Sequence, residues 1–182
     1  MELFEKTAEK NYIYNGKIIN VRRDIAEMPD GKHSIREVVE HNGGVCVAAL
    51  TENDELMFVR QFRYPYSEVI LELPAGKLEK GEDPFEAGKR ELEEETGCVA
   101  AKYPTLGKFY PTPGYCGEII YLYAAENLTE THMNLDDDEY LEVERIPLEK
   151  AVDMVLSGEI KDGKTQALVM RVAEMKRRGI IG

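Results

Sequence analysis

The sequence predicts a mixed α/β (α+β) domain in which a few helices pack on a mixed, mostly antiparallel sheet. Three observations support this fold class. Strand-length runs of alternating or β-branched residues occupy the N-terminal part of the chain, one strongly capped helix interrupts the strand pattern, and two helical stretches close the chain. With 182 residues and 43% hydrophobic content, the chain is long enough for one domain with a sizeable core.

The expected strands are separated by short polar turns such as residues 29–32 and 51–54, which favours antiparallel hairpins. Before the first helix the expected strands are residues 12–14, 17–28, 33–41, 45–50, 56–62 and 69–73, and after it they are residues 102–110, 118–125 and 140–145. We expect residues 1–42 to be an N-terminal strand extension of the domain whose main part is residues 43–182.

The first helix is expected over residues 84–96, after a glycine-bounded loop at residues 75–81. Asp83 suits the N-cap, Pro84 the first helical position and Gly97 the C-terminal stop. Two further helices are expected at residues 147–156 and 164–178, because the first opens on Pro147 and stops at Gly158 and the second stops at Gly179.

Charge and cysteine usage exclude several classes of function. A net charge of -12 disfavours nucleic acid and membrane surfaces as partners, since both require basic patches. The longest apolar runs have strand length, which is short of the roughly 20 residues that a membrane helix needs. The first residues show no secretory pattern, so the cytoplasm is the expected compartment. Cys46, Cys98 and Cys116 form no paired or CxxC pattern, which argues against disulfides and a zinc site.

The first helix carries an acidic face. With Glu91 at zero on a helical wheel, Glu94 falls at about -60°, Glu95 at about +40° and Glu93 near 200°. Leu92 belongs to the adjacent apolar stripe. Three carboxylates are therefore expected together at the edge of the core, with Glu93 on the far side.

A solvated glutamate-rich helix is the simpler alternative. Such helices usually place a basic residue three or four positions from each glutamate, but here only Glu93 and Glu94 have one, in Lys89 and Arg90. The like-charge spacing costs roughly 0.2–0.5 kcal/mol per pair. Uncompensated carboxylates beside a loop of backbone carbonyls suit hard cations, so a Mg²⁺ or Mn²⁺ site is the better interpretation.

The segment from Gly76 to Cys98 resembles the Nudix box at every fixed position. The matching residues are Gly76, Glu82, Arg90, Glu91, Leu92, Glu94, Glu95, Gly97 and Cys98. The resemblance implies an α/β/α sandwich with a mixed sheet, and a loop-helix-loop that binds metal and pyrophosphate.

The same resemblance implies a role for each position. Glu91, Glu95 and the carbonyl of Ala75 are implied as metal ligands, and Glu94 as a further ligand or auxiliary base. The remaining positions are structural: Glu82 and Arg90 brace the loop against the helix, and Gly76 and Gly97 meet the backbone requirements of turns.

A second acidic run, residues 136–139, precedes the strand expected at 140–145. From composition alone it would be a solvated loop. It resembles the catalytic-loop segment of ADP-ribose pyrophosphatases, which implies Glu139 as the general base, with Asp137 as a weaker candidate.

Three other segments extend the resemblance to that subgroup. Residues 58–63 end in Arg63, which the resemblance places on the substrate phosphates; alternation directs Arg60 to the opposite face. The alternative for both arginines is a surface charge at a strand edge.

The other two segments are implied to contact the sugar and the base. Pro113, Gly114 and Glu118 resemble the loop over the terminal ribose, although residues 115–117 replace its commoner polar or acidic filling. Arg36 and Glu37 align with positions near the adenine. A simple turn and a cross-strand charge pair are the alternatives.

The leading hypothesis is divalent-metal-dependent hydrolysis of ADP-ribose, a small-molecule nucleotide sugar, to AMP and ribose 5-phosphate. The same chemistry on GDP-mannose or a UDP-sugar, and a catalytically silent Nudix-fold ligand sensor, stay open as alternatives. By analogy with the subgroup, we expect a homodimer in which the N-terminal strands complete the adenine pocket of the partner.

Overall fold

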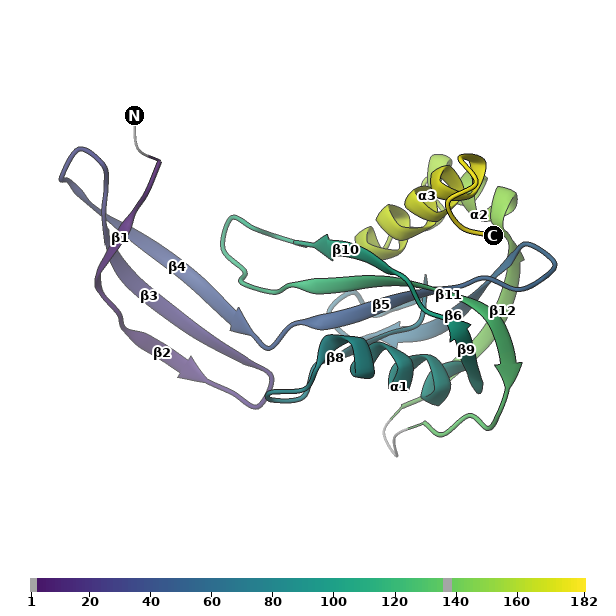
Figure 1. The fold of residues 1–182 in the computed structure, drawn as a ribbon. Helices are drawn as coiled ribbons and strands as arrows, with labels where there is room; N and C mark the ends of the chain where they lie inside the picture. Colours follow the sequence, from purple (N-terminus) through teal and green to yellow (C-terminus); the bar gives the residue numbers. More distant parts are fainter. Residues whose placement is uncertain (1–2, 136–138) are drawn as a thin grey trace. The chain divides into compact units, whose positions relative to one another are not determined.

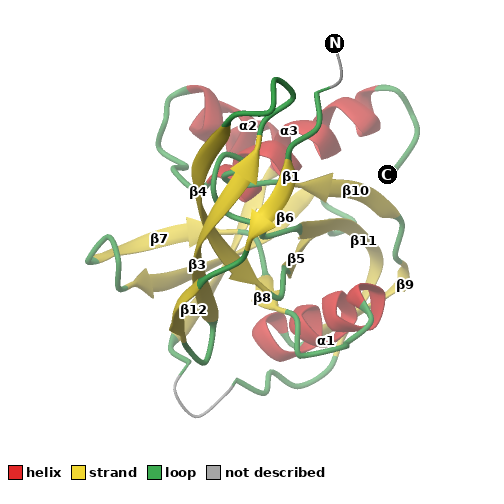
Figure 2. Ribbon diagram, turned by 90° about the vertical axis from the view of Figure 1, so that its left-hand side faces the viewer, coloured by secondary structure: helices red, strands yellow, loops and turns green. Residues whose placement is uncertain are grey.

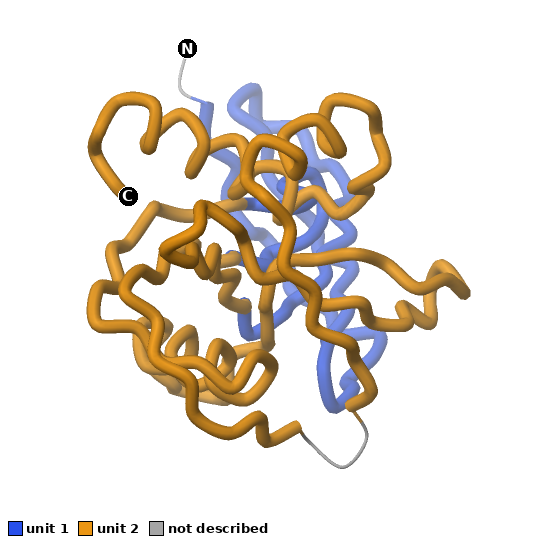
Figure 3. Tube along the Cα trace, turned by 90° about the vertical axis from the view of Figure 1, so that its right-hand side faces the viewer, with its two compact units in different colours: residues 1–43, 110–119 blue, residues 44–109, 120–182 orange. Residues whose placement is uncertain are grey.

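The computed structural model describes residues 3–135 and 139–182. The chain divides into two compact units (Figure 3): residues 1–43 with 110–119, and residues 44–109 with 120–182. The first unit thus ends one residue beyond the expected boundary at 42, and it also contains the segment 110–119, which we had assigned to the main part of the domain.

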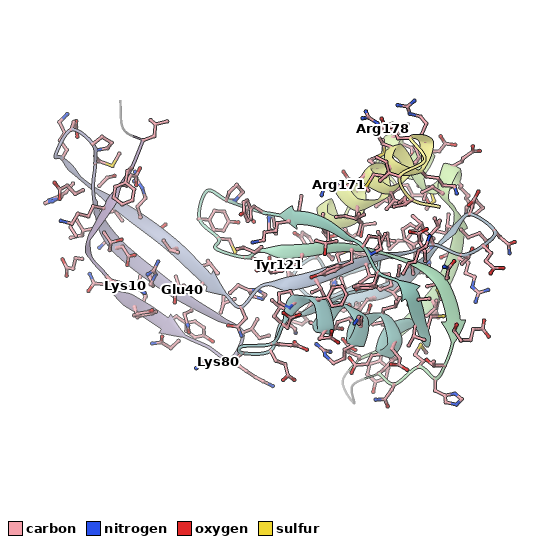
Figure 4. All side chains as sticks on the ribbon, viewed as in Figure 1. Lys10, Glu40, Lys80, Tyr121, Arg171 and Arg178 are labelled. Atoms are coloured by element: carbon pink, nitrogen blue, oxygen red, sulfur yellow. The ribbon has the colours of Figure 1, made fainter. Side chains whose placement is uncertain are left out.

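The first unit is built on a four-stranded antiparallel sheet (Figure 1). Its third strand pairs with all three others, and its long hairpin with the fourth runs in register from Ile19 opposite His41 to Glu27 opposite His33. Lys10 Nζ and Glu40 Oε1, both labelled in Figure 4, lie 3.3 Å apart on this sheet. The strands are β1 (Lys6–Glu9), β2 (Tyr12–Asn15), β3 (Ile19–Glu27) and β4 (His33–His41).

The segment 110–119 joins the same unit through backbone hydrogen bonds to β4. The Val39 N–H donates to the Tyr115 carbonyl at 2.8 Å, and the Gly117 N–H donates to the Val39 carbonyl at 2.9 Å. A loop far along the chain is therefore part of the N-terminal unit.

The second unit contains a mixed sheet and a three-stranded antiparallel sheet. In the mixed sheet β11 runs parallel to β5, from Ile120 opposite Gly44 to Ala125 opposite Ala49. The mixed sheet comprises β5 (Gly44–Ala49), β8 (Ala75–Lys77), β9 (Cys98–Lys102), β10 (Thr105–Phe109) and β11 (Ile120–Glu130). The antiparallel sheet comprises β6 (Glu55–Arg63), β7 (Glu68–Glu72) and β12 (Leu141–Pro147).

Three helices cover the strands of this unit on two sides. Figure 2 shows α1 on one side of the strands and α2 with α3 on the other. The largest cluster of buried apolar side chains lies under α2 and α3, and two smaller clusters lie under α1. The helices are α1 (Pro84–Thr96), α2 (Leu148–Leu156) and α3 (Gly163–Arg177). The expected α/β/α sandwich with a mixed sheet is confirmed.

The first helix has the predicted bounds and caps. Asp83 Oδ1 accepts hydrogen bonds from the backbone N–H groups of Phe85 at 2.9 Å and Glu86 at 3.2 Å. Gly97 ends the helix in the left-handed region, with φ of 64°. These signals are local in the chain, which is why the sequence locates this helix so well.

Three strands differ from the prediction. Both β1 and β9 were missed, and β8 lies where we expected a loop. β9 forms because Cys98 pairs with Glu130, at the far end of β11, which itself runs five residues beyond its expected end at 125. Such short strands exist only through distant pairing partners, which local sequence patterns do not contain.

Cys46 and Cys98 are buried, and all three cysteines are free. In the part of the chain that the structure describes, every helix is too short or too polar to cross a membrane.

Candidate active site

Helix α1 carries the predicted acidic cluster into the edge of the core of the second unit. Glu95 is 1% exposed and Glu91 is 7% exposed, next to the buried Leu92. Glu94 and Glu93 are half-buried. The two most buried carboxylates of α1 are therefore the two that the Nudix resemblance implies as metal ligands.

The short strand β8 passes directly under these carboxylates. The Ala75 N–H donates a hydrogen bond to Glu95 Oε2 at 2.9 Å. A Cβ atom built on Gly76 would lie 1.9 Å from Glu91 Cδ. Gly76 has no positive φ, so our expectation of a turn requirement is wrong at this position, whereas it holds at Gly97. Gly76 is needed because the Glu91 carboxylate occupies the space of a side chain.

Arg90 links the helix to the preceding loop. Its Nη1 lies 2.9 Å from Glu91 Oε1 and donates to Glu94 Oε2 at 2.7 Å. Its Nε donates to Glu82 Oε1 at 3.0 Å, and Glu82 Oε2 accepts from the Glu79 N–H at 2.9 Å. Glu82 and Arg90 thus lie where a brace between loop and helix is expected.

The expected pairing of Lys89 with Glu93 is wrong, because Lys89 Nζ donates to Glu86 Oε1 at 3.1 Å. Arg90 also contacts Glu91, which we had counted as uncompensated. One guanidinium therefore serves three carboxylates around the site.

Burial dominates the electrostatics of the two inner carboxylates. It raises the pKa of Glu95 to about 8, against the opposing effect of the Ala75 hydrogen bond. It raises the pKa of Glu91 to about 7, against the opposing effect of Arg90. Buried carboxylates held close together need cationic partners to stay ionised.

The donor chemistry fits a hard divalent cation. Glu91 and Glu95 carry carboxylate oxygens, and Ala75, whose N–H donates to Glu95, carries a backbone carbonyl; all of these are oxygen donors, which such ions prefer. Within residues 3–135 and 139–182, however, no three His, Cys, Asp or Glu side chains converge as a ready ligand set. Glu94 accepts a hydrogen bond from Arg90 through Oε2 alone, so its second carboxylate oxygen could still act as a ligand.

Glu139 approaches the same cluster from the segment before β12. It is half-buried, and its charge is one of the factors that raise the pKa of both Glu91 and Glu95, after burial. The other candidate base, Asp137, lies outside the described residues. Glu139 is therefore the described member of the acidic run that lies near these carboxylates.

The two arginines of β6 have different surroundings. Arg60 Nε donates to Glu144 Oε2 on β12 at 2.8 Å. Arg63 binds Glu72 through two hydrogen bonds, of 2.5 Å from Nε and 2.7 Å from Nη2. The Arg63 charge also lowers the pKa of Glu95, against the larger effect of burial.

Sequence reasoning missed the ion network behind Arg63. Glu72 is 2% exposed and also binds Lys164, at the start of α3, whose Nζ lies 3.1 Å from Asp162 Oδ1. A signal was present, because Glu72 is the lone charge of the strand expected at residues 69–73, between Leu71 and Leu73. Lys164 carried no such signal.

The expected sugar and base contacts all belong to the first unit. Arg36 Nε donates to Glu5 Oε2 at 2.8 Å, which is an ion pair, although not with the strand opposite. Glu37 is exposed. Pro113 and Gly114 are exposed as well, and Glu118 Oε1 lies 3.3 Å from His41 Nδ1.

Comparisons with known proteins agree with these features. The family model described as "NUDIX domain" matches residues 40–168, and the one described as "Nucleoside diphosphate sugar hydrolase N-terminal domain" matches residues 5–39. An ADP-ribose pyrophosphatase of Bacillus subtilis (strain 168) is 46% identical over 90% of this chain and 89% of its own. A methanol dehydrogenase activator of Bacillus methanolicus is 40% identical over 88% of each chain.

The fold also has a solved counterpart. The crystal structure of an ADP compounds hydrolase matches with a TM-score of 0.85 and 21% identity, over 100% of both chains. At that identity the match supports the fold alone.

Proposed function

The chain belongs to the Nudix family, and from that premise we propose that it hydrolyses the pyrophosphate bond of ADP-ribose to AMP and ribose 5-phosphate, using Mg²⁺ or Mn²⁺. One observation carries the proposal: Glu91 and Glu95 are buried side by side on α1, against a glycine that leaves room for a carboxylate. Two carboxylates with raised pKa are unfavourable in a merely structural role.

Glu91, Glu95 and the carbonyl of Ala75 would hold the metal, with Glu94 as a further ligand or auxiliary base. A bound divalent ion supplies charge neutralisation at the phosphates and a water of lowered pKa. Glu139 would accept the proton of the attacking water. It lies beside the proposed ligands, is not part of α1, and is not among the carboxylates that bond to Arg90. Arg63 would bind the phosphates as a fixed cation.

ADP-ribose is proposed as the substrate because a relative with 46% identity is an ADP-ribose pyrophosphatase, and because residues 5–39 match the N-terminal domain of nucleoside diphosphate sugar hydrolases. We assign Arg36 and Glu37 to the adenine, and Pro113, Gly114 and Glu118 to the terminal ribose. We propose that the protein acts as a homodimer in the cytoplasm; its three free thiols suit a reducing compartment.

A hydrolysis screen of ADP-ribose, GDP-mannose, UDP-glucose and NADH, each with Mg²⁺ or Mn²⁺, tests the substrate. We expect the highest kcat/KM for ADP-ribose, with AMP and ribose 5-phosphate as products by chromatography. A higher kcat/KM for GDP-mannose or UDP-glucose would show that the proposed reaction takes place on that nucleotide sugar and not mainly on ADP-ribose. No turnover of any of the four would refute the proposal.

The metal assignment is tested by Glu95→Gln, with Glu93→Gln as the matched control on the same helix. Because Glu93 lies away from the cluster, its variant should keep parental activity. Glu95→Gln should lower kcat by orders of magnitude with an unchanged circular dichroism spectrum. Full Mg²⁺-dependent turnover by Glu95→Gln would contradict the assignment.

A further inference from the structure

A chain of alternating charges runs from the end of β6 to the start of α3. It consists of Arg63, Glu72, Lys164 and Asp162, in that order of contact. Glu72 is almost completely buried and receives both cations on its two oxygens. Isolated surface ion pairs are common, but a buried carboxylate between two cations requires a specific arrangement of three elements.

The pairing of Arg63 with Glu72 is not the default for this hairpin. The residue directly opposite Arg63 on β7 is Glu68, whereas Glu72 lies opposite Val59. Glu68 instead accepts a hydrogen bond from Lys161 Nζ at 2.8 Å. The Arg63 side chain therefore passes over the nearer, more exposed carboxylate and lies along the face of the sheet.

This arrangement leaves one edge of the guanidinium available. Nε and Nη2 of Arg63 donate to the two oxygens of Glu72, and in the described part of the chain Nη1 has no hydrogen-bond partner. The Arg63 side chain is 35% exposed. A bidentate carboxylate fixes the plane of a guanidinium, so the direction of the free Nη1 group is fixed as well.

Arg63 and Lys164 together keep Glu72 in its charged form. Burial alone would raise the pKa of Glu72, but the hydrogen bonds and charges of Arg63 and Lys164 hold it below its ordinary value. Asp162 in turn balances the charge of Lys164. The network is close to neutral and stays ionised without any ligand.

We propose that Glu72 is a positioning residue that holds the Arg63 guanidinium in the orientation that binds the substrate pyrophosphate. The inference rests on the proposed function, because it assigns Arg63 to that phosphate group. Glu72 is too buried to touch the substrate and acts through Arg63. Its neighbour Glu68, at the exposed end of the hairpin, has no such role.

Glu72→Gln tests the proposal, because it preserves size and removes the charged bidentate acceptor. Misplacing a substrate-binding group by about 1 Å can cost on the order of 100-fold in rate, so we expect kcat/KM for ADP-ribose to fall by about 10- to 100-fold. The matched control is Glu144→Gln, which removes the charged hydrogen-bond partner of Arg60, the other arginine of β6. It should retain the parental kcat/KM.

A double-mutant cycle with Arg63→Lys separates positioning from a general structural effect. Lysine keeps the charge but cannot be held in a bidentate pair, so Glu72→Gln should cause little further loss in the Arg63→Lys background. The Mn²⁺ affinity of Glu72→Gln, measured by electron paramagnetic resonance, should match that of the parent protein. Parental kcat/KM in Glu72→Gln, or an equal loss in both backgrounds, would overturn the proposal.

Two arms keep the test decisive. If Glu72→Gln does not fold, Glu72→Asp retains the charge but shortens the reach, and parental kcat/KM in both Glu72→Asp and Arg63→Lys would overturn the positioning role. If the parent protein does not hydrolyse ADP-ribose, the proposed function fails separately. Inorganic pyrophosphate binding, measured by calorimetry, then decides: equal affinity in Glu72→Gln and Glu144→Gln would overturn the inference.

Discussion

Replacing Gly76 by alanine should remove activity without unfolding the protein. The added Cβ would lie 1.9 Å from both Cδ and Oε1 of Glu91 and 2.2 Å from its Oε2. Unbonded carbon atoms rest at about 3.5 Å or more, so the carboxylate must move by about 1.5 Å. β8 itself has little freedom to yield, because it is paired with β5, where Gly76 lies opposite the buried Val45.

The size of the effect follows from this displacement. Functional groups must be held within about 0.5 Å of their working positions, and a shift of about 1 Å can cost on the order of 100-fold. We therefore expect kcat/KM of Gly76→Ala to fall by at least about 100-fold, together with weaker metal binding. The overpacking should cost only about 1–3 kcal/mol of folding free energy, since the backbone at residue 76 needs no left-handed conformation.

Steady-state hydrolysis of ADP-ribose over a Mg²⁺ titration measures the loss, and urea unfolding measures the stability. Gly163→Ala is the matched control, because the nearest atom to its added Cβ, Phe109 Cζ, is at an ordinary contact distance of 3.7 Å. Gly163→Ala should retain parental activity. Parental kcat/KM and parental metal affinity in Gly76→Ala would refute the geometric reasoning.

Three further predictions follow from the same site and its helix. Glu139→Gln should lower kcat by about 10²- to 10⁴-fold in steady-state assays while Mn²⁺ affinity stays within the parental range; an unchanged kcat would exclude Glu139 as the base. In metal-free buffer, the melting temperature should fall as pH rises from about 5 to about 8. Glu91 and Glu95 have folded-state pKa values of about 7 and about 8, above the ordinary 4.5. The folded protein therefore binds more protons than the unfolded chain over this interval, and it loses stability as these protons dissociate. Glu95→Gln should flatten that dependence, and a melting temperature that rises over the interval would contradict the assigned burial. Asp83→Ala should lower the free energy of unfolding by about 1 kcal/mol in urea titrations with kcat unaffected, since it removes the N-cap of α1; unchanged stability would show that the two capping bonds contribute nothing.

Much of the site could be predicted from the sequence because its determinants are local. Helix periodicity brings Glu91 and Glu95 to one face, and the capping residues Asp83 and Gly97 set both ends of α1. Each of these signals spans a few positions, so no knowledge of the rest of the chain is needed. The mixed α/β class follows in the same way from strand-length and helix-length patterns, whereas the α/β/α sandwich was implied by the resemblance to the Nudix box.

The partners of these groups depended on the tertiary structure. Glu72 and Lys164 are separated by 92 positions, and they meet only because α3 packs beside β7. The function of Gly76 as space for Glu91, and the existence of β9, likewise require two distant segments to be in contact. The sequence by itself determined which carboxylates form the acidic face, because helical geometry is set over a single turn; only the tertiary structure decided which charges and glycines surround them, because those contacts depend on how separate elements pack.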